Sequence, residues 1–553
     1  MERVKYFTLG GNDENGKNMS VIEINDEIYI VDAGVRYPQS SELLGVEIII
    51  PDFSYLIKHK NRIRGIFITH AHDDVMGALP YLLKEIKAPI YTTPLTAIMI
   101  KDLLKKNHVK GYKINEIKRN GEFKIGNRNV ITFGVTHSIP DTFGFAIYTK
   151  NGYIVHSSEY VIDFDVQKES FGCDIANLSE IGKKGVLMLT VESVSAHKEG
   201  FTSPHHRIAD RLERIFESTK DRIITTVYDQ NIYRLIEVIE MAHKFKRKVF
   251  FYNEEQRKLL SHLERLGYYK LPKGIEVYPN HFNNKMDNVV VIIGQTGPDV
   301  FRVMHRIASG EDQIIELNPK DTVVIASPIV PGTDVIAGAM EDELYKEGVR
   351  IESMNYKEVA SMHASKEDIK MMLSMMKPKY YVPIKGDYQN LIKNADVGFD
   401  MGLLAKDIIV LDNGQVATFE NGKHIHSKDT VKLEEVLIDG KEHLDTSGLV
   451  LRDRKILAND GAIIAGLVIN HKTKEIIGGP DVQSRGVIYL KNADNIIGQV
   501  GEILEKTVET ARKEKRFENV KVRNEAREKI SRYIFKETGK RPMVLPVIIE
   551  VNL

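Results

Sequence analysis

Short apolar blocks, bounded by glycine, proline and polar residues, recur along the first third of the chain. This pattern is typical of strands joined by turns. It predicts strands at 6–11, 20–24, 27–34, 66–68, 129–135, 145–149, 153–156 and 186–193. Two of these strands flank Lys150-Asn151-Gly152, a turn sequence that favours a hairpin. We therefore expect a β-rich domain in the N-terminal part of the chain.

The spacing of apolar residues changes after Pro204. An amphipathic helix is predicted at 208–219, and strands and helices then alternate at 222–226, 231–245, 248–252, 254–266 and 288–294, with a further strand at 321–327. Such alternation favours a parallel sheet with crossover helices. The sequence therefore predicts a separate α/β domain here.

A third pattern occupies the C-terminal region. Strands at 462–470 and 544–551 flank two helical patterns at 493–513 and 520–538. A charged stretch near 439–446 precedes them and is typical of a linker. We expect a small C-terminal α/β module.

Length and composition limit the class of protein. At 553 residues the chain is too long for one hydrophobic core, and with the single cysteine Cys173 it forms no internal disulfide. The first residues lack the apolar core of a signal peptide, and the longest apolar runs are too short to cross a bilayer. We expect a soluble, multidomain, cytoplasmic protein that does not bind membranes.

Charge adds little to this picture. The 77 basic and 77 acidic residues balance, which argues neither for nor against a polyanionic partner. Basic residues exceed acidic ones at 512–541, on helix-like sequence. A solvated helix face is the commoner explanation, and contact with RNA is the alternative.

The strongest chemical pattern follows the strand at 66–68. His70 and His72 are two positions apart, Asp74 follows two positions later, and Gly77 allows the chain to change direction. Imidazole and carboxylate together are the ligands of Zn²⁺ or Mn²⁺ sites, in which a bound water becomes acidic enough to attack a phosphoryl or carbonyl centre. The alternative is a set of polar loop residues.

These residues resemble the signature of the metallo-β-lactamase superfamily, His-x-His-x-Asp-His. His70, His72 and Asp74 take its first three positions, and Val75 takes the fourth, where an isopropyl group cannot bind a metal. The resemblance implies that His137, at the end of the strand 129–135, is the third histidine of the site. It also implies that Glu159 stands where the superfamily has an aspartate that bridges two metals.

Asp32, at the end of the strand 27–34, matches a superfamily aspartate that supports the metal site without binding the metal. Its alternative role is to cap the turn at Ala33-Gly34.

Motifs further along the chain narrow the resemblance. Four segments are similar to motifs of ribonuclease J, a β-CASP nuclease. They are Ser361-Met362-His363-Ala364-Ser365, the segment 378–388, the segment 447–454 and Ser484-Arg485-Gly486. The resemblance covers nearly the whole chain. It implies an α/β fold, namely a metallo-β-lactamase αββα sandwich with an inserted β-CASP domain and a C-terminal α/β module.

The implied domains are a first metallo-β-lactamase part at 1–203, the β-CASP domain at 204–365 and a second metallo-β-lactamase part at 366–440. A linker at 441–450 and a dimerisation module at 451–553 follow.

The same resemblance assigns further residues. Asp74 and His363 are the implied catalytic residues, and the implied substrate-binding residues are Val359, Ala360, Ser361, Met362, His363, Glu192 and Ser193. Met362 replaces the glycine that usually precedes the histidine of the phosphate-contacting loop. Lys385 replaces a histidine that binds the second metal in this family, so Val75 and Lys385 are two lost ligand positions.

We therefore expect one Zn²⁺ or Mn²⁺ ion at most, held by His70, His72, Asp74, His137 and Glu159. The Lys385 ammonium could neutralise Asp74 and Glu159 in place of a second ion, or it could point into solvent. Because two-metal catalysis needs both ions, we expect weak nuclease activity at best.

The resemblance implies a protein of RNA maturation and mRNA decay that works beside an active ribonuclease J paralogue, as a homodimer or a hetero-oligomer. Three function classes stay open: an RNA-binding scaffold subunit, a ribonuclease that uses one metal in exo or endo mode, and a small-molecule metallohydrolase. The nucleotide-domain pattern and the basic C-terminal module argue against the third class.

Overall fold

The computed structural model describes residues 2–38, 45–166, 168–297, 299–329, 333–354, 359, 361–426, 428–440, 442–443, 449–487 and 493–552. The chain forms two compact units. The first comprises residues 1–39 and 48–436, and the second comprises residues 40–47 and 437–553. β4 (Ile48–Ile50) belongs to the first unit, β21 (Val436–Asp439) lies at the boundary, and β22 (Glu442–His443) belongs to the second. Most of the expected linker 441–450 lies outside the described residues.

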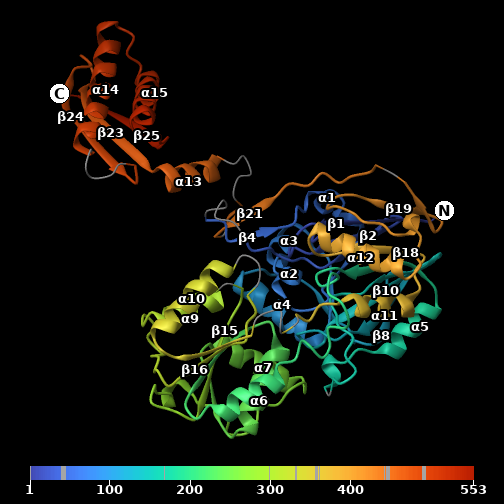
Figure 1. Cartoon of the computed structure of the whole chain (residues 1–553). Coiled ribbons are helices and arrows are strands. Elements are labelled where there is room, and N and C mark those ends of the chain that lie inside the picture. The colour runs from blue at the N-terminus through green and yellow to red at the C-terminus, as the bar shows by residue number, and fades with distance from the viewer. Residues whose placement is uncertain are drawn as a thin grey trace. The chain divides into compact units, whose positions relative to one another are not determined.

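Part of the first unit is a sandwich of two sheets (Figure 1). One sheet has the strand order β20 (Lys423–Ile425), β19 (Ala417–Glu420), β1 (Arg3–Gly10), β2 (Met19–Ile24), β3 (Glu27–Val31), β5 (Ile63–Phe67), β6 (Ile90–Thr92), β7 (Ile114–Glu116). The other has the order β18 (Tyr380–Ile384), β12 (Val186–Glu192), β11 (Gly152–His156), β10 (Phe143–Thr149), β9 (Arg128–Gly134), β8 (Gly121–Ile125). The expected hairpin at 150–152 joins β10 to β11.

One hydrophobic core lies between the two sheets. Alternate strand residues point into it, as the pleat of a strand requires, so that Phe67 of β5 stacks on Phe145 of β10 at a ring distance of 4.2 Å. A second core covers the outer face of the sheet that contains β12. There, side chains of α5 (Ile175–Lys183), α11 (Lys366–Met376) and α12 (Tyr388–Asp400) pack on the strands.

Further short helices belong to the part of the unit that contains the other sheet: α1 (Ser54–Lys58), α2 (Asp73–Met76), α3 (Leu79–Glu85) and α4 (Pro94–Lys106). α3 packs against α4, and α4 against β7. Two sheets face to face with helices outside them form the αββα sandwich that the resemblance implied.

A second domain is inserted into this sandwich. Its sheet is entirely parallel, in the order β14 (Lys248–Phe251), β15 (Val289–Gln295), β13 (Ile223–Tyr228), β16 (Thr322–Ile325), β17 (Arg350–Ser353). The helices are α6 (Ala209–Ser218), α7 (Ile232–Lys244), α8 (Glu254–Arg265), α9 (Asp299–Ala308) and α10 (Asp334–Lys346). The alternation in the sequence predicted this parallel sheet correctly.

The insertion separates two strands that are neighbours in the sandwich. β12 and β18 pair in parallel, with Glu192 opposite Ile384, although the inserted domain lies between them in sequence. β11 pairs in parallel with β12 on its other side. The carboxyl ends of these three strands therefore lie together, and the residues that follow them form one edge of the site.

The second unit contains α13 (Leu449–Asp460), β23 (Ala462–Asn470), β24 (Ile476–Arg485), α14 (Ala493–Lys513), α15 (Asn519–Thr538) and β25 (Met543–Val551). Its sheet has the order β24-β23-β25, and α14 and α15 contact these strands. The sequence analysis did not predict β24, because Gly478-Gly479-Pro480 in its middle is typical of a turn. Gly479 has a φ of +90° within the strand, which is why glycine is needed there.

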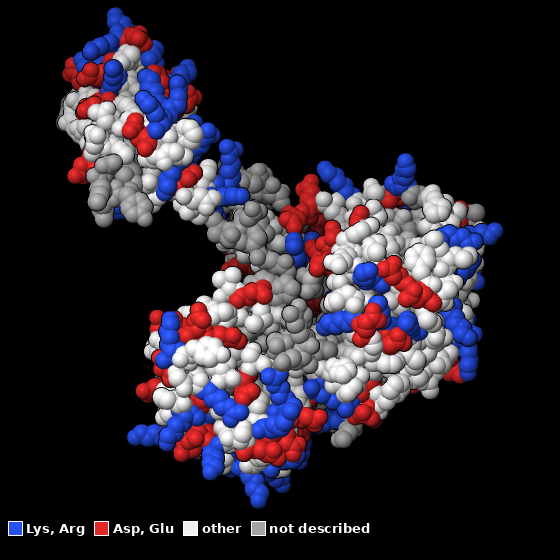
Figure 2. All heavy atoms as spheres, in the orientation of Figure 1, with Lys and Arg blue, Asp and Glu red and all other residues white. Residues whose placement is uncertain are grey.

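None of the described helices is both long and apolar enough to cross a lipid bilayer. On the face seen in Figure 2, basic and acidic side chains are interspersed on both units.

A buried ion pair joins two strands of the inserted domain. Arg222, which is fully buried just before β13, donates from Nε and Nη2 to the two carboxylate oxygens of Asp321, at 3.0 and 2.6 Å. Arg222 Nη1 also donates to Asn284 Oδ1 at 2.9 Å. The pair therefore fixes the start of β13 beside the start of β16.

We predict that Arg222→Met lowers the free energy of unfolding by about 3–5 kcal/mol, because Asp321 would keep a buried charge without its partner. Urea unfolding followed by circular dichroism measures this, since the chain has no tryptophan. The control is Arg350→Met, whose pair with Glu352 is exposed and should contribute about 0–1 kcal/mol. Equal losses in the two variants would contradict the prediction.

Candidate metal centre

The end of β3 holds the metal-ligand motif in place. After β5 the chain turns at His70 and enters the short helix α2, which contains Asp74 and Val75. The N–H of Ala33 donates to the carbonyl oxygen of Val75, at 2.6 Å. The carbonyl of Asp74 passes so close to Gly34 that a Cβ atom there would collide with it. Glycine at 34 therefore allows α2 to lie against β3, which aims Asp74 into the site.

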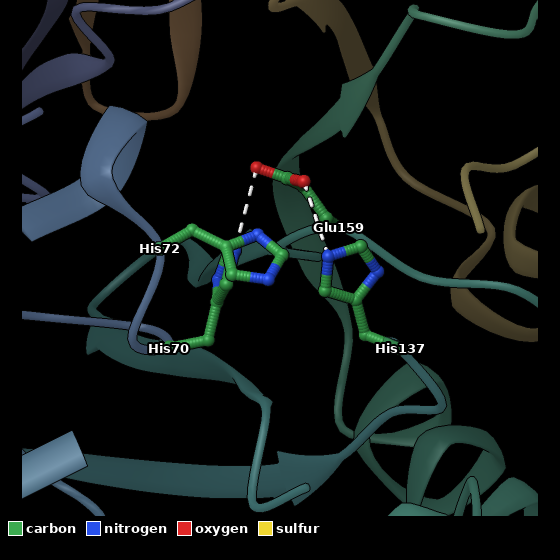
Figure 3. A group of neighbouring side chains, drawn as sticks. All are labelled: His70, His72, His137 and Glu159. Atoms are coloured by element: carbon green, nitrogen blue, oxygen red, sulfur yellow. Dashed lines mark ion pairs between the residues drawn. The ribbon is translucent and has the colours of Figure 1, made fainter. Parts of the chain in front are cut away.

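Three histidines and one glutamate converge beside α2 (Figure 3). His70, His72 and His137 each offer a ring nitrogen, and Glu159 offers a carboxylate oxygen, all within 4.8 Å of one another. The Glu159 oxygens lie 3.6 Å from Nε2 of His70 and 3.3 Å from Nε2 of His137. Both of these Nε2 atoms are buried and have no hydrogen-bond partner among the described residues. This donor set fits one divalent metal ion.

The histidines are electrostatically suited to bind a cation. Burial lowers the pKa of His70 and His137 well below the ordinary value, and neighbouring His72 lowers both further. Burial also lowers the pKa of His72, to about 4, although Asp74 opposes the shift. The three imidazoles are therefore neutral at physiological pH, which leaves their lone pairs available to a metal.

Hydrogen bonds orient the rings from outside. His137 Nδ1 lies 2.8 Å from the carbonyl oxygen of Met362, and His70 Nδ1 lies 3.0 Å from Thr69 Oγ1. The N–H and hydroxyl of Thr69 donate to Asp32 Oδ1. Burial raises the pKa of Asp32 to about 7, against these hydrogen bonds. Asp32 thus supports the orientation of His70 through Thr69, a relay like those that hold metal ligands in place.

Lys385 stands at a position where the resemblance implies a ligand of a second metal ion. Lys385, which is buried, forms an ion pair with Asp74 Oδ2 at 2.8 Å and a closer one with Glu159 Oε1. Burial alone would raise the pKa of Asp74, but Lys385 and His72 lower it to about 2. Val75 is buried and adds only an apolar side chain. These residues do not fit a second metal ion. Of the two orientations that the sequence left open for Lys385, the structure has the inward one.

The substrate residues implied by the sequence divide into two groups. His363 joins the site: its Nδ1 lies 2.7 Å from Glu192 Oε2 and 3.6 Å from Glu159 Oε2. Burial lowers the pKa of His363, but the charge and hydrogen bond of Glu192, together with the charge of Asp74, raise it, so that the pKa lies above the ordinary value. Ser361 and Met362 lie beside it and line the same cavity.

The second group lies away from the cavity. Ser193 is buried and donates to the carbonyl oxygen of Ile384 at 2.8 Å, so its hydroxyl is part of the strand-end packing. Val359 is also buried and is not among the residues that line the cavity. Ala360 lies outside the described residues.

A cavity of about 330 Å³ lies between the sandwich and the inserted domain, within the first unit. Its lining includes residues that the sequence analysis missed: Tyr37, Gln230, Asn231, Arg234 and Thr296. Gln230 and Thr296 follow the parallel strands β13 and β15. Ligands of parallel sheets bind outside the carboxyl ends of the strands. The position of Gln230 and Thr296 shortly after predicted strands was therefore the signal that could have identified these two residues.

Comparison with known proteins assigns the family. Family models match four segments: the Metallo-beta-lactamase superfamily at 12–162, the Ribonuclease J, beta-CASP domain at 220–344, the Zn-dependent metallo-hydrolase RNA specificity domain at 348–398, and the Ribonuclease J C-terminal domain at 449–551. Ribonuclease J 2 of Staphylococcus epidermidis RP62A is 33% identical over 551 residues, covering 99% of this chain and 98% of that protein. The chain belongs to the ribonuclease J family.

Ribonuclease J 2 of Staphylococcus aureus NCTC 8325 is 32% identical over the same share of both chains. A solved structure of a protein of unknown function from Enterococcus faecalis V583 is similar in fold, with a TM-score of 0.52 and 16% identity, covering 75% of this chain and all of that one. The family models describe metal-dependent hydrolases, and the histidine and glutamate group of this ribonuclease J chain could hold a metal.

We predict that His137→Ala weakens binding of a divalent cation at least about 10- to 100-fold, because loss of a direct ligand costs no less than loss of a residue that orients one. Metal content after dialysis, measured by mass spectrometry, tests this. His108→Ala is the control, since His108 is exposed on the surface. Unchanged metal content in His137→Ala would show that the cation binds elsewhere.

Proposed function

We propose that this chain is a ribonuclease J-type RNA-processing protein that binds RNA in the cavity between the sandwich and the β-CASP domain, with weak or absent nuclease activity of its own. The proposal rests on one observation. The cavity is lined by histidines and a glutamate that could hold one metal ion, and Lys385 stands beside them in place of a ligand for a second ion. The name of the RNA specificity domain matched at 348–398 and the names of the relatives support RNA as substrate.

We propose that one ion at most, Zn²⁺ or Mn²⁺, is held by His70, His72, His137 and Glu159. When bound, it would acidify a water molecule. Of the residues with an implied catalytic role, Asp74 is poorly placed to accept a proton. Its Oδ2 is paired with Lys385, Asn18 Nδ2 donates to it at 2.9 Å, and its pKa is about 2. This supports weak rather than full activity.

His363 retains a role that does not depend on a second ion. Its Glu192 partner favours the charged imidazolium, and His363 lines the cavity beside Ser361. A charged imidazolium and a hydroxyl are suitable donors to phosphate oxygens. Arg234 is less suitable, because its guanidinium is buried and donates to the carbonyl oxygens of Ala326 and His206.

Two alternatives remain within the same family. A competent ribonuclease that uses one metal would cleave RNA by itself, and a scaffold subunit would bind RNA without cleaving it. We favour little or no cleavage, with an active ribonuclease J paralogue supplying the chemistry.

The C-terminal module supports the proposed assembly. One face of its sheet packs on α14 and α15 through residues such as Ile463 and Leu467. The alternate residues face away and are exposed, namely Ile464, Ile477, Leu545, Val547 and Ile549. An open apolar sheet face of this kind is typical of a protein interface. We propose that it pairs with a second copy of the chain or with the paralogue.

The module is a weaker candidate for RNA binding. Several basic side chains of α15 are paired with acidic ones, such as Lys529 with Glu525 and Arg532 with Glu528, one helical turn apart. This matches the solvated helix face that the sequence analysis considered the commoner explanation.

We predict that the protein alone binds 5′-monophosphorylated RNA at moderate salt but cleaves it slowly or not at all. His363→Ala should lower the RNA affinity about tenfold, because a charged donor to phosphate is lost. Filter binding and gel-resolved cleavage measure the two quantities. His281→Ala, on the exposed surface of the β-CASP domain, is the control. Unchanged affinity in His363→Ala would refute the assigned loop, and rapid cleavage by the protein alone would favour the one-metal ribonuclease.

We predict that a chain ending at Gly440 loses most oligomerisation, because it lacks the exposed sheet face. Light scattering measures the mass of the full-length and shortened chains. The matched test within the full chain is Val547→Lys with Ile549→Lys, which places charge on the face without touching the core. If both altered proteins kept the same number of chains per particle as the full-length protein, the prediction would be contradicted.

A further inference from the structure

We propose that the ammonium group of Lys385 replaces the second metal ion as a permanent internal cation, so that the pocket stays folded and neutralised without that ion. The proposal goes beyond the proposed function, because it concerns how the pocket is stabilised whether or not RNA binds. The resemblance implies a second metal position, and the residues found there do not fit a second ion.

The backbone aims Lys385 into the pocket. Lys385 follows β18 and has a φ of +58°, in the left-handed region that lysine rarely adopts. Its N–H donates to Asn12 Oδ1 at 3.1 Å, and its carbonyl oxygen accepts from the N–H of Ser193 at 3.1 Å. The next residue, Gly386, donates to the carbonyl oxygen of Gly11 at 3.0 Å. Hydrogen bonds on several sides therefore hold the backbone of Lys385 in an unusual conformation. This supports a fixed, inward position of its side chain rather than one that points into solvent.

The ammonium contacts carboxylates from two separate segments. Asp74 belongs to α2, and Glu159 follows β11. Among the described residues, Lys385 is the only lysine or arginine that forms an ion pair with either carboxylate. Lys385 itself follows β18, so one cation joins three parts of the sandwich. A bridging metal ion would join the same parts.

Charge explains why this substitution preserves the site. Asp74 and Glu159 are two acids in a largely buried pocket. Removing Lys385, the only lysine or arginine paired with them in the described part of the chain, would leave buried charges unpaired, which is strongly unfavourable. With Val75 and Lys385 in place of imidazoles, the ligands for a second ion would be reduced to these two carboxylates. Lysine supplies a positive charge and hydrogen-bond donors that can reach both.

The Lys385 ammonium and a second divalent cation compete for the same carboxylates. Loss of the ammonium should therefore make the pocket depend on an added cation, whereas the natural chain should not show this dependence at the second position.

The experiment compares Lys385→Met with the natural chain, using thermal unfolding by circular dichroism in EDTA and in Mn²⁺. We expect Lys385→Met to unfold at a lower temperature in EDTA and to gain more from Mn²⁺ than the natural chain does. Lys101→Met is the control, since Lys101 pairs with Glu116 in an exposed position. Equal unfolding temperatures and equal Mn²⁺ shifts for Lys385→Met and the natural chain would overturn the proposal.

A second variant keeps the proposal testable if Lys385→Met does not fold. Val75→His, Lys385→His and Glu159→Asp together restore the ligand types of the family signature. We expect one additional metal ion per chain by mass spectrometry, and Lys385→His alone should be less stable than the natural chain without gaining this ion. A triple variant with the metal content of the natural chain would overturn the proposal. Because these tests contain no RNA, their failure would leave the proposed RNA binding to its own experiment.

Discussion

The parallel pairing of β12 with β18 is the constraint on which the site depends. The chain leaves the sandwich after Glu192, forms the β-CASP domain, and returns so that Ile384 lies opposite Glu192. This pairing places His363, Glu192 and Lys385 beside the histidines that follow β5 and β9. Because the pairing residues are far apart in sequence, His363 and Lys385 reach the histidines only where the chain returns to the sandwich from the inserted domain.

The pocket contains both neutral histidines and acids that are paired with cationic side chains. Burial keeps His70, His72 and His137 neutral, as metal ligands must be. The acids beside them are paired instead: Glu192 with His363, and Asp74 and Glu159 with Lys385. The histidine side of the pocket could thus hold a metal ion, whereas the side with Asp74 already contains the Lys385 ammonium group. This division is consistent with the proposal that the chain keeps the metallo-β-lactamase fold but holds one metal ion at most.

The local motifs made much of the fold and site predictable. His70, His72 and Asp74 occur within one turn after an apolar strand, so their convergence follows from a single change of direction in the chain. The alternating pattern after Pro204 predicted the parallel sheet because each strand and crossover helix is a local unit. The strand β24 was missed because Gly478-Gly479-Pro480 is locally typical of a turn, and only pairing with β23 makes it a strand.

The sequence by itself determined which side chains are available to the site: three histidines with nearby acids, and valine and lysine where the resemblance implies two histidines. Only the tertiary structure decided where the lysine points, because that depends on hydrogen bonds to Asn12 and Ser193, which are distant in sequence. It also decided that Ser193 packs inside the fold rather than facing the cavity. The physical reason is the same in both cases. A residue type limits the chemistry a position can perform, whereas burial and charge pairing depend on segments brought together by folding.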